Sequence, residues 1–253
     1  MRHRILTAVL AVTLVACEQP PPAPTVPASS QPVAPAAAAQ TDAHFAELSA
    51  RWLEGKLRLS PVYATAMGDH RFDGDIDDLG IQGRRAVIEL SRKTLAELDG
   101  LDAATLSREN QVDALILRNQ VEFDLWSVEI SQDWAWDPQV YSQLAGGAIY
   151  SLMAREFAPI EERLANVALR IEKLPDLYRQ MRENLDPKRV PRGHAETVSK
   201  QHAGVLSLID ELVLPQAAGL EPAAKERLDS AVAALRTAVT TQQTWIDESL
   251  VPN

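Results

Sequence analysis

Residues 159–185 read "PIEERLANVALRIEKLPDLYRQMRENL", and their apolar side chains recur with the period of an α-helix. Spacings of three and four residues place side chains on one face, because one helical turn holds about 3.6 residues. That face is formed by Ile160, Leu164, Val167, Ala168, Ile171 and Leu174. The pattern predicts a helix that begins at Pro159, where a first-turn proline is tolerated. Since Pro175 lacks the backbone N–H that a helix interior uses, we expect a second, shorter helix from Pro175 to Leu185.

The same period extends over the rest of the chain from Thr41 onwards. Apolar stripes predict further helices that begin near Thr41, Pro61, Val87, Ser107, Pro191 and Leu228, with Gly68 and Gly100 as helix ends and Ser107 as an N-cap. The stripe after Ser107 contains Val112, Leu115, Ile116, Asn119, Phe123, Trp126 and Ile130. No run of alternating β-branched residues competes with these helices. The sequence therefore predicts an all-α fold, a multi-helix bundle or array over residues 41–253.

The first seventeen residues have the features of a secretory signal. Basic residues at positions 2–4 precede an apolar run, Ile5 to Ala16, that is shorter than the roughly 20 residues a membrane-spanning helix needs. The tetrad Leu-Val-Ala-Cys at residues 14–17 resembles the lipobox of bacterial lipoproteins. The resemblance implies a signal peptide over residues 1–16 and lipidation of Cys17, which would become the first mature residue. Because Cys17 is the chain's single cysteine, an intramolecular disulfide is impossible.

A tether is expected between Cys17 and the helical body. Residues 18–40 are rich in Pro, Ala, Ser, Gln and Thr, and such segments stay extended because they bury too little apolar surface to fold. We assign residues 17–40 to the lipidated cysteine and linker, although the run Ala36–Ala39 could instead begin the first helix. Acyl chains would anchor the protein on a membrane in the periplasm. Glu18 follows the cysteine where inner-membrane lipoproteins usually carry Asp, so by that analogy the outer membrane is favoured over the inner.

The formal net charge of −10 argues against nucleic acid as a partner, because phosphate backbones are bound by clustered Lys and Arg. Zinc hydrolysis on a helix would use His-Glu-x-x-His, and none of the chain's five histidines forms that motif. His202 lies between Val198 and Val205 on an apolar stripe, which predicts a hydrogen-bonded core histidine. The Asp73-x-Asp75-x-Asp77 run lacks the later residues of an EF-hand loop. We therefore assign no catalytic residue and no metal ligand.

Four aromatic residues suggest a place where a ligand could bind. Trp134, Trp136, Tyr141 and Tyr150 surround the pair Gly146-Gly147 and could line a groove for sugars or peptides. Aromatic residues with this spacing more often fill a core. Both readings stay open from the sequence.

Several longer stretches together resemble one bacterial family. They are "LSPVYATAMGDHRFDGDIDDLG" (59–80), "ENQVDALILRNQVE" (109–122), "RIEKLPDLYRQMRENLDP" (170–187) and "TWIDESLVPN" (244–253). This combination resembles the family called domain of unknown function 885, which is mostly helical, similar to helical zinc metallopeptidases and often lipid-anchored. The family carries a His-Glu-Ala-x-Pro-Gly-His type zinc motif in its C-terminal half. The resemblance implies that residues 41–253 are its N-terminal half, truncated before the catalytic half.

The resemblance implies that the catalytic C-terminal half of the family is missing from this chain, and the expected function follows from that. We expect no cofactor in this chain, zinc in the C-terminal half alone, and no activity by this chain in isolation. Its expected partners are the membrane, through the lipid anchor, and a C-terminal half or a peptide substrate. Two alternatives stay open: a self-sufficient helical binding or scaffold lipoprotein, and one half of a split peptidase completed by another chain. The apolar face of the last helix reaches Leu250, which also indicates that more sequence normally follows.

Overall fold

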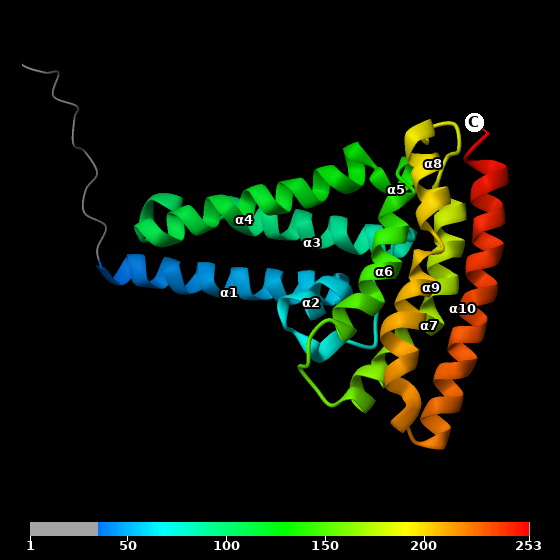
Figure 1. Ribbon diagram of the computed structural model, residues 1–253. Helices are drawn as coiled ribbons and strands as arrows, with labels where there is room; N and C mark the ends of the chain where they lie inside the picture. The colour runs from blue at the N-terminus through cyan, green and yellow to red at the C-terminus, as the bar shows by residue number, and fades with distance from the viewer. Residues whose placement is uncertain (1–34, 253) are drawn as a thin grey trace, which may run out of the picture. The chain divides into compact units, whose positions relative to one another are not determined.

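The computed structural model describes residues 35–252, and within them every regular element is helical (Figure 1). The α-helices are α1 (Pro35–Leu59), α2 (Pro61–Met67), α3 (Ile81–Asp99), α4 (Arg108–Trp126), α5 (Asp133–Trp136), α6 (Gln139–Met153), α7 (Ile160–Asn184), α8 (Arg192–Gln201), α9 (Gly204–Leu208) and α10 (Pro222–Ser249). Short 3₁₀ turns occupy His70–Phe72, Ala103–Thr105 and Leu214–Gly219, and π turns occupy Ser127–Ser131 and Ile209–Val213. The predicted all-α class is confirmed.

The predictions at the N-terminus fall largely outside the described residues. These are the signal peptide over residues 1–16, the lipidation of Cys17 and the linker up to residue 34. Helix α1 begins at Pro35, before the boundary expected at residue 41, and it includes the Ala36–Ala39 run. None of the helices within residues 35–252 combines the length and the hydropathy that a membrane-spanning segment needs.

Several helix ends lie where the local sequence places them. Gly68 ends α2 with a φ of 91°, a left-handed conformation that glycine adopts without strain. Gly100 follows the last residue of α3. The Ser107 hydroxyl accepts a hydrogen bond from the Asn110 backbone N–H at 3.3 Å, as an N-cap does.

Helix α7 does not break at Pro175, and the expectation of two helices there is wrong. The helix is continuous for 25 residues. A proline inside a helix costs about 3 kcal/mol. Leu174 and Leu177, on either side of Pro175, are buried, and each buried side chain of this size contributes about 1.5–3 kcal/mol. Packing on both sides of the proline therefore outweighs the lost hydrogen bond.

The larger of two apolar clusters is built around α7, which packs against α6 and α10. Its fully buried members include Tyr141, Ile149, Ile171, Leu235 and Ile246. Helix α8 and the α9 segment contact α6, and α8 also contacts α10 (Figure 1). This cluster supplies most of the apolar burial that stabilises the described residues.

The single helix expected after Pro191 is interrupted. Helix α8 ends at Gln201, and the chain continues as α9 and then as a π turn. At the interruption His202 is 2% exposed, and its ring lies edge-on to Tyr178 at 4.9 Å. Neither ring nitrogen has a hydrogen-bond partner of good geometry, so the histidine is in the core as expected but is not hydrogen-bonded as expected. Burial lowers the pKa of His202 to about 4, against weaker opposing effects of the Val239 backbone and Asp247.

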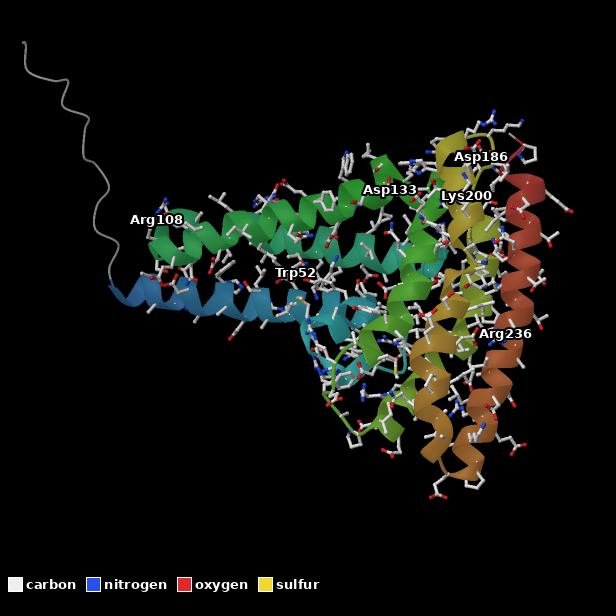
Figure 2. The ribbon with its side chains drawn as sticks, viewed as in Figure 1. Trp52, Arg108, Asp133, Asp186, Lys200 and Arg236 are labelled. Atoms are coloured by element: carbon white, nitrogen blue, oxygen red, sulfur yellow. The ribbon has the colours of Figure 1, made fainter. Side chains whose placement is uncertain are left out.

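A second, smaller cluster joins α1, α3 and α4. Its buried members are Phe45, Leu48, Leu98, Leu106, Leu117 and Val121. Trp52 of α1 packs against it while partly exposed (Figure 2). Lys56 of α1 donates to the Asp124 carboxylate of α4 at 2.8 Å, which ties these two helices together.

Candidate functional site

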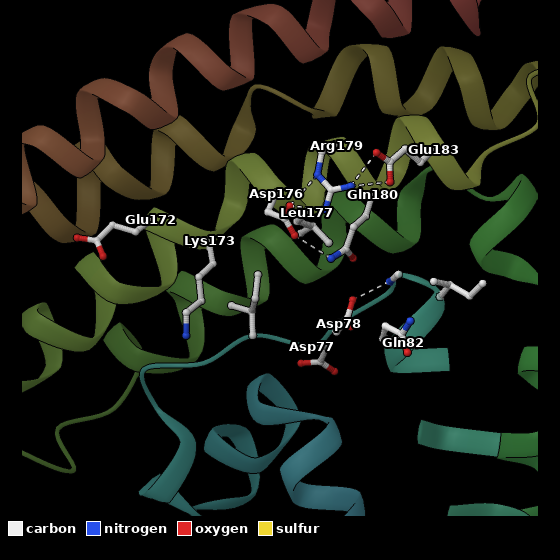
Figure 3. Close-up of a pocket in the computed structure, with 13 residues that line it drawn as sticks. Asp77, Asp78, Gln82, Glu172, Lys173, Asp176, Leu177, Arg179, Gln180 and Glu183 are labelled. Atoms are coloured by element: carbon white, nitrogen blue, oxygen red, sulfur yellow. Dashed lines mark hydrogen bonds and ion pairs between the residues drawn. The ribbon is translucent and has the colours of Figure 1, made fainter. Parts of the chain in front are cut away.

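A polar cleft of about 520 Å³ lies between α7 and the segment that leads into α3 (Figure 3). The segment contributes Ile76, Asp77, Asp78 and Gly80, the first turn of α3 contributes Ile81 and Gln82, and α7 contributes Glu172, Lys173, Asp176, Leu177, Arg179, Gln180 and Glu183. These two walls come from parts of the chain about a hundred residues apart. The cleft therefore exists only in the folded chain.

Hydrogen bonds made by the backbone N–H and carbonyl of Leu79 join the two walls. The Leu79 N–H donates to Gln180 Oε1 at 3.0 Å. The Leu79 carbonyl accepts from Arg84 Nη1 at 2.6 Å and from Asn184 Nδ2 at 2.9 Å. A Cβ at Gly83 would lie 1.8 Å from the Asp78 carbonyl oxygen, so the first turn of α3 can approach this segment only with glycine at that position.

The charges in the cleft are mostly compensated by neighbours. Lys173 pairs with Asp75 and donates to the Gly74 carbonyl at 2.7 Å. Arg179 donates to Asp176 and to Glu183 on its own helix. Figure 3 shows this ion-paired row along α7, facing the segment that carries Asp77 and Asp78.

Asp77 differs from the other carboxylates of the cleft because it is largely desolvated. Burial raises its pKa, against the Val62 N–H that donates to it at 3.1 Å and the positive charge of Arg170. Within residues 35–252 no group of three His, Cys, Asp or Glu side chains is arranged to hold a metal ion.

Behind the cleft, the guanidinium of Arg170 is completely buried. It donates to the carbonyls of Ala148 and Pro61 at 2.9 and 3.2 Å, and to the hydroxyls of Ser151 and Thr65 at 3.0 and 2.6 Å. These contacts join α2, α6 and α7. Burial lowers the pKa of Arg170 to about 10, and the negative charge of Asp73 is the largest opposing effect.

Asp73 extends this network toward the surface. Its carboxylate accepts from the Thr65 hydroxyl at 2.6 Å and lies 3.0 Å from His70 Nδ1. The His70 ring stacks on Phe157 at 3.7 Å. A buried cation is thus linked through one hydroxyl to a buried carboxylate and a half-exposed imidazole, an arrangement that stabilises the junction of three helices.

The aromatic residues singled out in the sequence fall into two places. Trp134 and Tyr141 are in direct contact, since the Tyr141 hydroxyl donates to the Trp134 carbonyl at 2.6 Å and accepts from Asn184 at 3.0 Å. Trp136, on α5 with Trp134, donates through its indole N–H to the Ser131 carbonyl. Tyr150 is 56% exposed and lies about 13 Å further along α6, beside His70 and Phe157.

The first of these places resembles a packed core more than an open groove. Tyr141 is fully buried, and its burial raises the pKa of its hydroxyl to about 12. The guanidinium of Arg84 covers the Trp134 ring at 3.8 Å from its centre. The groove formed by all four aromatic residues stays a prediction.

One feature of the surface was not anticipated from the sequence. Six large apolar side chains on α4 and the following π turn face solvent, and we name them the α4 stripe: Val112, Leu115, Ile116, Phe123, Trp126 and Ile130. Leu115, Ile116 and Ile130 are 66%, 63% and 69% exposed. The opposite face of the helix, with Leu117 and Val121, packs against α1 and α3.

A shallow apolar hollow of about 530 Å³ borders the α4 stripe. It lies between α1 and α4, and its lining includes Phe45, Trp52, Leu53 and Ile116. Leu53 is itself 48% exposed. The hollow extends the apolar surface from α4 onto α1.

These features define an all-helical protein with a polar cleft and an uncovered apolar helix face. Residues 61–253 match the family described as "Bacterial protein of unknown function (DUF885)", and the chain belongs to this family. The resemblance noted in the sequence is thereby confirmed.

Comparison with solved structures gives a consistent result. The chain is similar to a "putative lipoprotein of unknown function" from Shewanella oneidensis, with a TM-score of 0.75 and 25% sequence identity. The similarity covers 81% of this chain and 37% of the Shewanella chain. The chain therefore spans little more than a third of the solved protein that it matches. No curated protein matches it.

Proposed function

We propose that this protein is a membrane-anchored periplasmic lipoprotein that carries the non-catalytic N-terminal part of a zinc-peptidase-like domain and is inactive by itself. The observation that carries the proposal is the partial match to the Shewanella protein, 37% of whose chain is covered.

Anchoring rests on Cys17 and on the description of the Shewanella protein as a lipoprotein. We expect Cys17→Ser to abolish incorporation of labelled palmitate and to release the protein from membranes. Because Glu18 follows the cysteine, we expect the wild type to fractionate with the outer membrane, and Glu18→Asp to shift it toward the inner membrane. Retention of the label in Cys17→Ser would contradict lipidation at this residue.

The missing catalytic region is tested most directly at the level of the gene. We expect the DNA downstream of the Asn253 codon to encode a His-Glu-x-x-His segment, either in frame or as a separate polypeptide. Absence of such a segment in every frame would remove the main support for a peptidase-like protein. A metal-dependent hydrolysis of peptides by the purified 253-residue chain would contradict its inactivity alone.

The large cluster around α7 favours a second candidate, a self-sufficient helical binding or scaffold lipoprotein. Its 28 buried apolar residues form a core within the described residues. This candidate predicts a monodisperse protein that melts cooperatively without metal and binds a peptide or sugar in the polar cleft. A split peptidase predicts instead that a polypeptide with the zinc motif co-purifies with this chain.

A further inference from the structure

We infer that the α4 stripe is the docking surface for a helix with one apolar face. This helix belongs to the family region that corresponds to the part of the Shewanella protein beyond the match. The inference rests on the proposed function, since it requires that such a region exists. It adds to that function the residues through which the two regions meet.

The spacing of the stripe is that of a helix-packing face. Residues 112, 116, 119, 123, 126 and 130 follow one another at alternating intervals of four and three, the pattern that keeps contacts along one side of a helix. The stripe extends about 27 Å along the helix axis. Asn119 is the single polar residue in this series and lies between Ile116 and Phe123 in sequence. The rings of Phe123 and Trp126 stack at 5.9 Å. A second helix could therefore pack along it over five turns.

The exposure of these side chains distinguishes the stripe from an ordinary surface. Six large apolar residues lie along α4 and the following π turn, and each is at least 40% exposed. Contiguous apolar surface of this extent usually marks an interaction site, because its burial is favourable. The hollow between α1 and α4 continues the surface beyond Ile116 and gives a bulky side chain a place to insert.

The charges that border the stripe favour a particular occupant. The segment 108–131 contains two arginines and five acidic residues, among them Glu109, Asp113 and Glu122 beside the stripe. A second copy of the chain would bring acidic borders together, and the chain as a whole has a net charge of −10. An anionic lipid surface would be repelled in the same way, since helices that bind membranes carry Lys and Arg on their polar face. The surface therefore fits an apolar helix flanked by basic residues.

The coverage of the Shewanella chain indicates where such a helix could come from. The matched part is 37% of that chain, and the α4 stripe lies within the family match over residues 61–253 of this one. The remaining 63% of the Shewanella chain is long enough to supply a helix that packs against the matched part. Six of the eleven large apolar side chains that are exposed in the described residues belong to the α4 stripe, which makes it a suitable surface for that part.

Site-specific photocrosslinking of the full chain in its native cells tests the inference. Benzoylphenylalanine placed at Ile116 should give a crosslinked peptide whose sequence belongs to the DUF885 family beyond the part spanned here. The same amino acid at Thr237, an exposed position on α10, is the matched control and should not give that peptide. The double substitution Leu115→Asp and Phe123→Asp should reduce the yield of the Ile116 crosslink at least tenfold, and Thr237→Asp should leave it unchanged.

Other results would overturn the inference. A crosslink from Ile116 to a second copy of segment 108–131 would assign the stripe to self-association, and a crosslink to lipid would assign it to the membrane. Equal products at Ile116 and Thr237 would show that the stripe has no specific partner. If the crosslinked family segment lacks a zinc motif, the peptidase-like function fails and the docking surface stands. If the motif is encoded downstream and Ile116 crosslinks elsewhere, the docking surface fails and the proposed function stands.

Discussion

Replacing Arg170 with methionine should lower the free energy of unfolding by about 3–5 kcal/mol. The guanidinium is fully buried and makes four hydrogen bonds, to two carbonyls and two hydroxyls on α2 and α6. A hydrogen bond from a charged group contributes about 1.5–3 kcal/mol, so the four together contribute on the order of 6–12 kcal/mol. Burial of the charge offsets several kcal/mol of this gain, and the lowered pKa of Arg170, about 10, has the same cause.

Methionine keeps an unbranched apolar stem, which limits the cavity left by the substitution. It removes the buried positive charge that interacts with Asp73 and Asp77, and it leaves the carbonyls and hydroxyls without their donor. Loss of one member of a buried charge network typically costs about 3–5 kcal/mol. The hydrogen-bond total and this range therefore agree.

Urea unfolding followed by circular dichroism measures the effect. The midpoint should fall by more than about 1 M with an unchanged slope, because a chain of this length has a slope near 3 kcal/mol per molar urea. Arg179→Met on the same helix is the control. Arg179 is half-exposed and pairs with Asp176 and Glu183, so its loss should cost less than about 1 kcal/mol. If the two variants unfold within 1 kcal/mol of each other, the buried network does not stabilise the junction of α2, α6 and α7.

Three further predictions concern other parts of the fold. The pKa of His202 is about 4 in the folded chain and 6.5 in the unfolded chain, so the unfolded chain binds more protons between these pH values. The free energy of unfolding is therefore highest above pH 6.5 and falls by about 3 kcal/mol toward pH 4. His202→Leu should remove this pH dependence when unfolding is measured across that range. Pro175→Ala should raise stability by up to about 2 kcal/mol in thermal unfolding, because the restored helix hydrogen bond outweighs the entropy that the unfolded chain regains; a lower melting temperature would show that the proline ring contributes packing. Gly83→Ala should lower the free energy of unfolding by at least about 2 kcal/mol, because the added Cβ would overlap the Asp78 carbonyl. Gly193→Ala, on α8 where the added Cβ meets open space, should be neutral or stabilising by up to about 1 kcal/mol. Equal effects of the two variants in chemical unfolding would contradict the close approach at Gly83.

Local sequence signals were sufficient for the fold class and for several helix ends. The three-and-four spacing along α7 and α10 reflects burial on one face, and Gly68 and Ser107 act through contacts within a few residues of themselves. The continuity of α7 through Pro175 could not be predicted in this way. It depends on Leu174 and Leu177 being buried by other helices, and a local rule for proline contains no information about those partners.

The site was less accessible to sequence reasoning for the same reason. The polar cleft depends on a hydrogen bond between Leu79 and Gln180, which are 101 residues apart. Both residues lie in stretches that carry the family resemblance, but nothing in either stretch indicates that the two residues meet. The spacing on α4 correctly marked an apolar stripe, but periodicity does not tell whether a stripe is covered. Trp134, Trp136, Tyr141 and Tyr150 were grouped from proximity along the chain, which does not indicate that Trp134 and Tyr141 are in contact while Tyr150 lies further along α6.

The division of apolar burial between two clusters has a consequence for how the chain opens. In the described residues the cluster of α1, α3 and α4 has six buried apolar side chains, whereas the cluster around α7 has 28. Segments with little burial exchange their amide hydrogens through local opening well below the free energy of global unfolding. We therefore expect the amides of α1, α3 and α4 to exchange with deuterium first. Binding of a helix to the α4 stripe should slow this exchange, so exchange in these three helices would report whether the partner is bound.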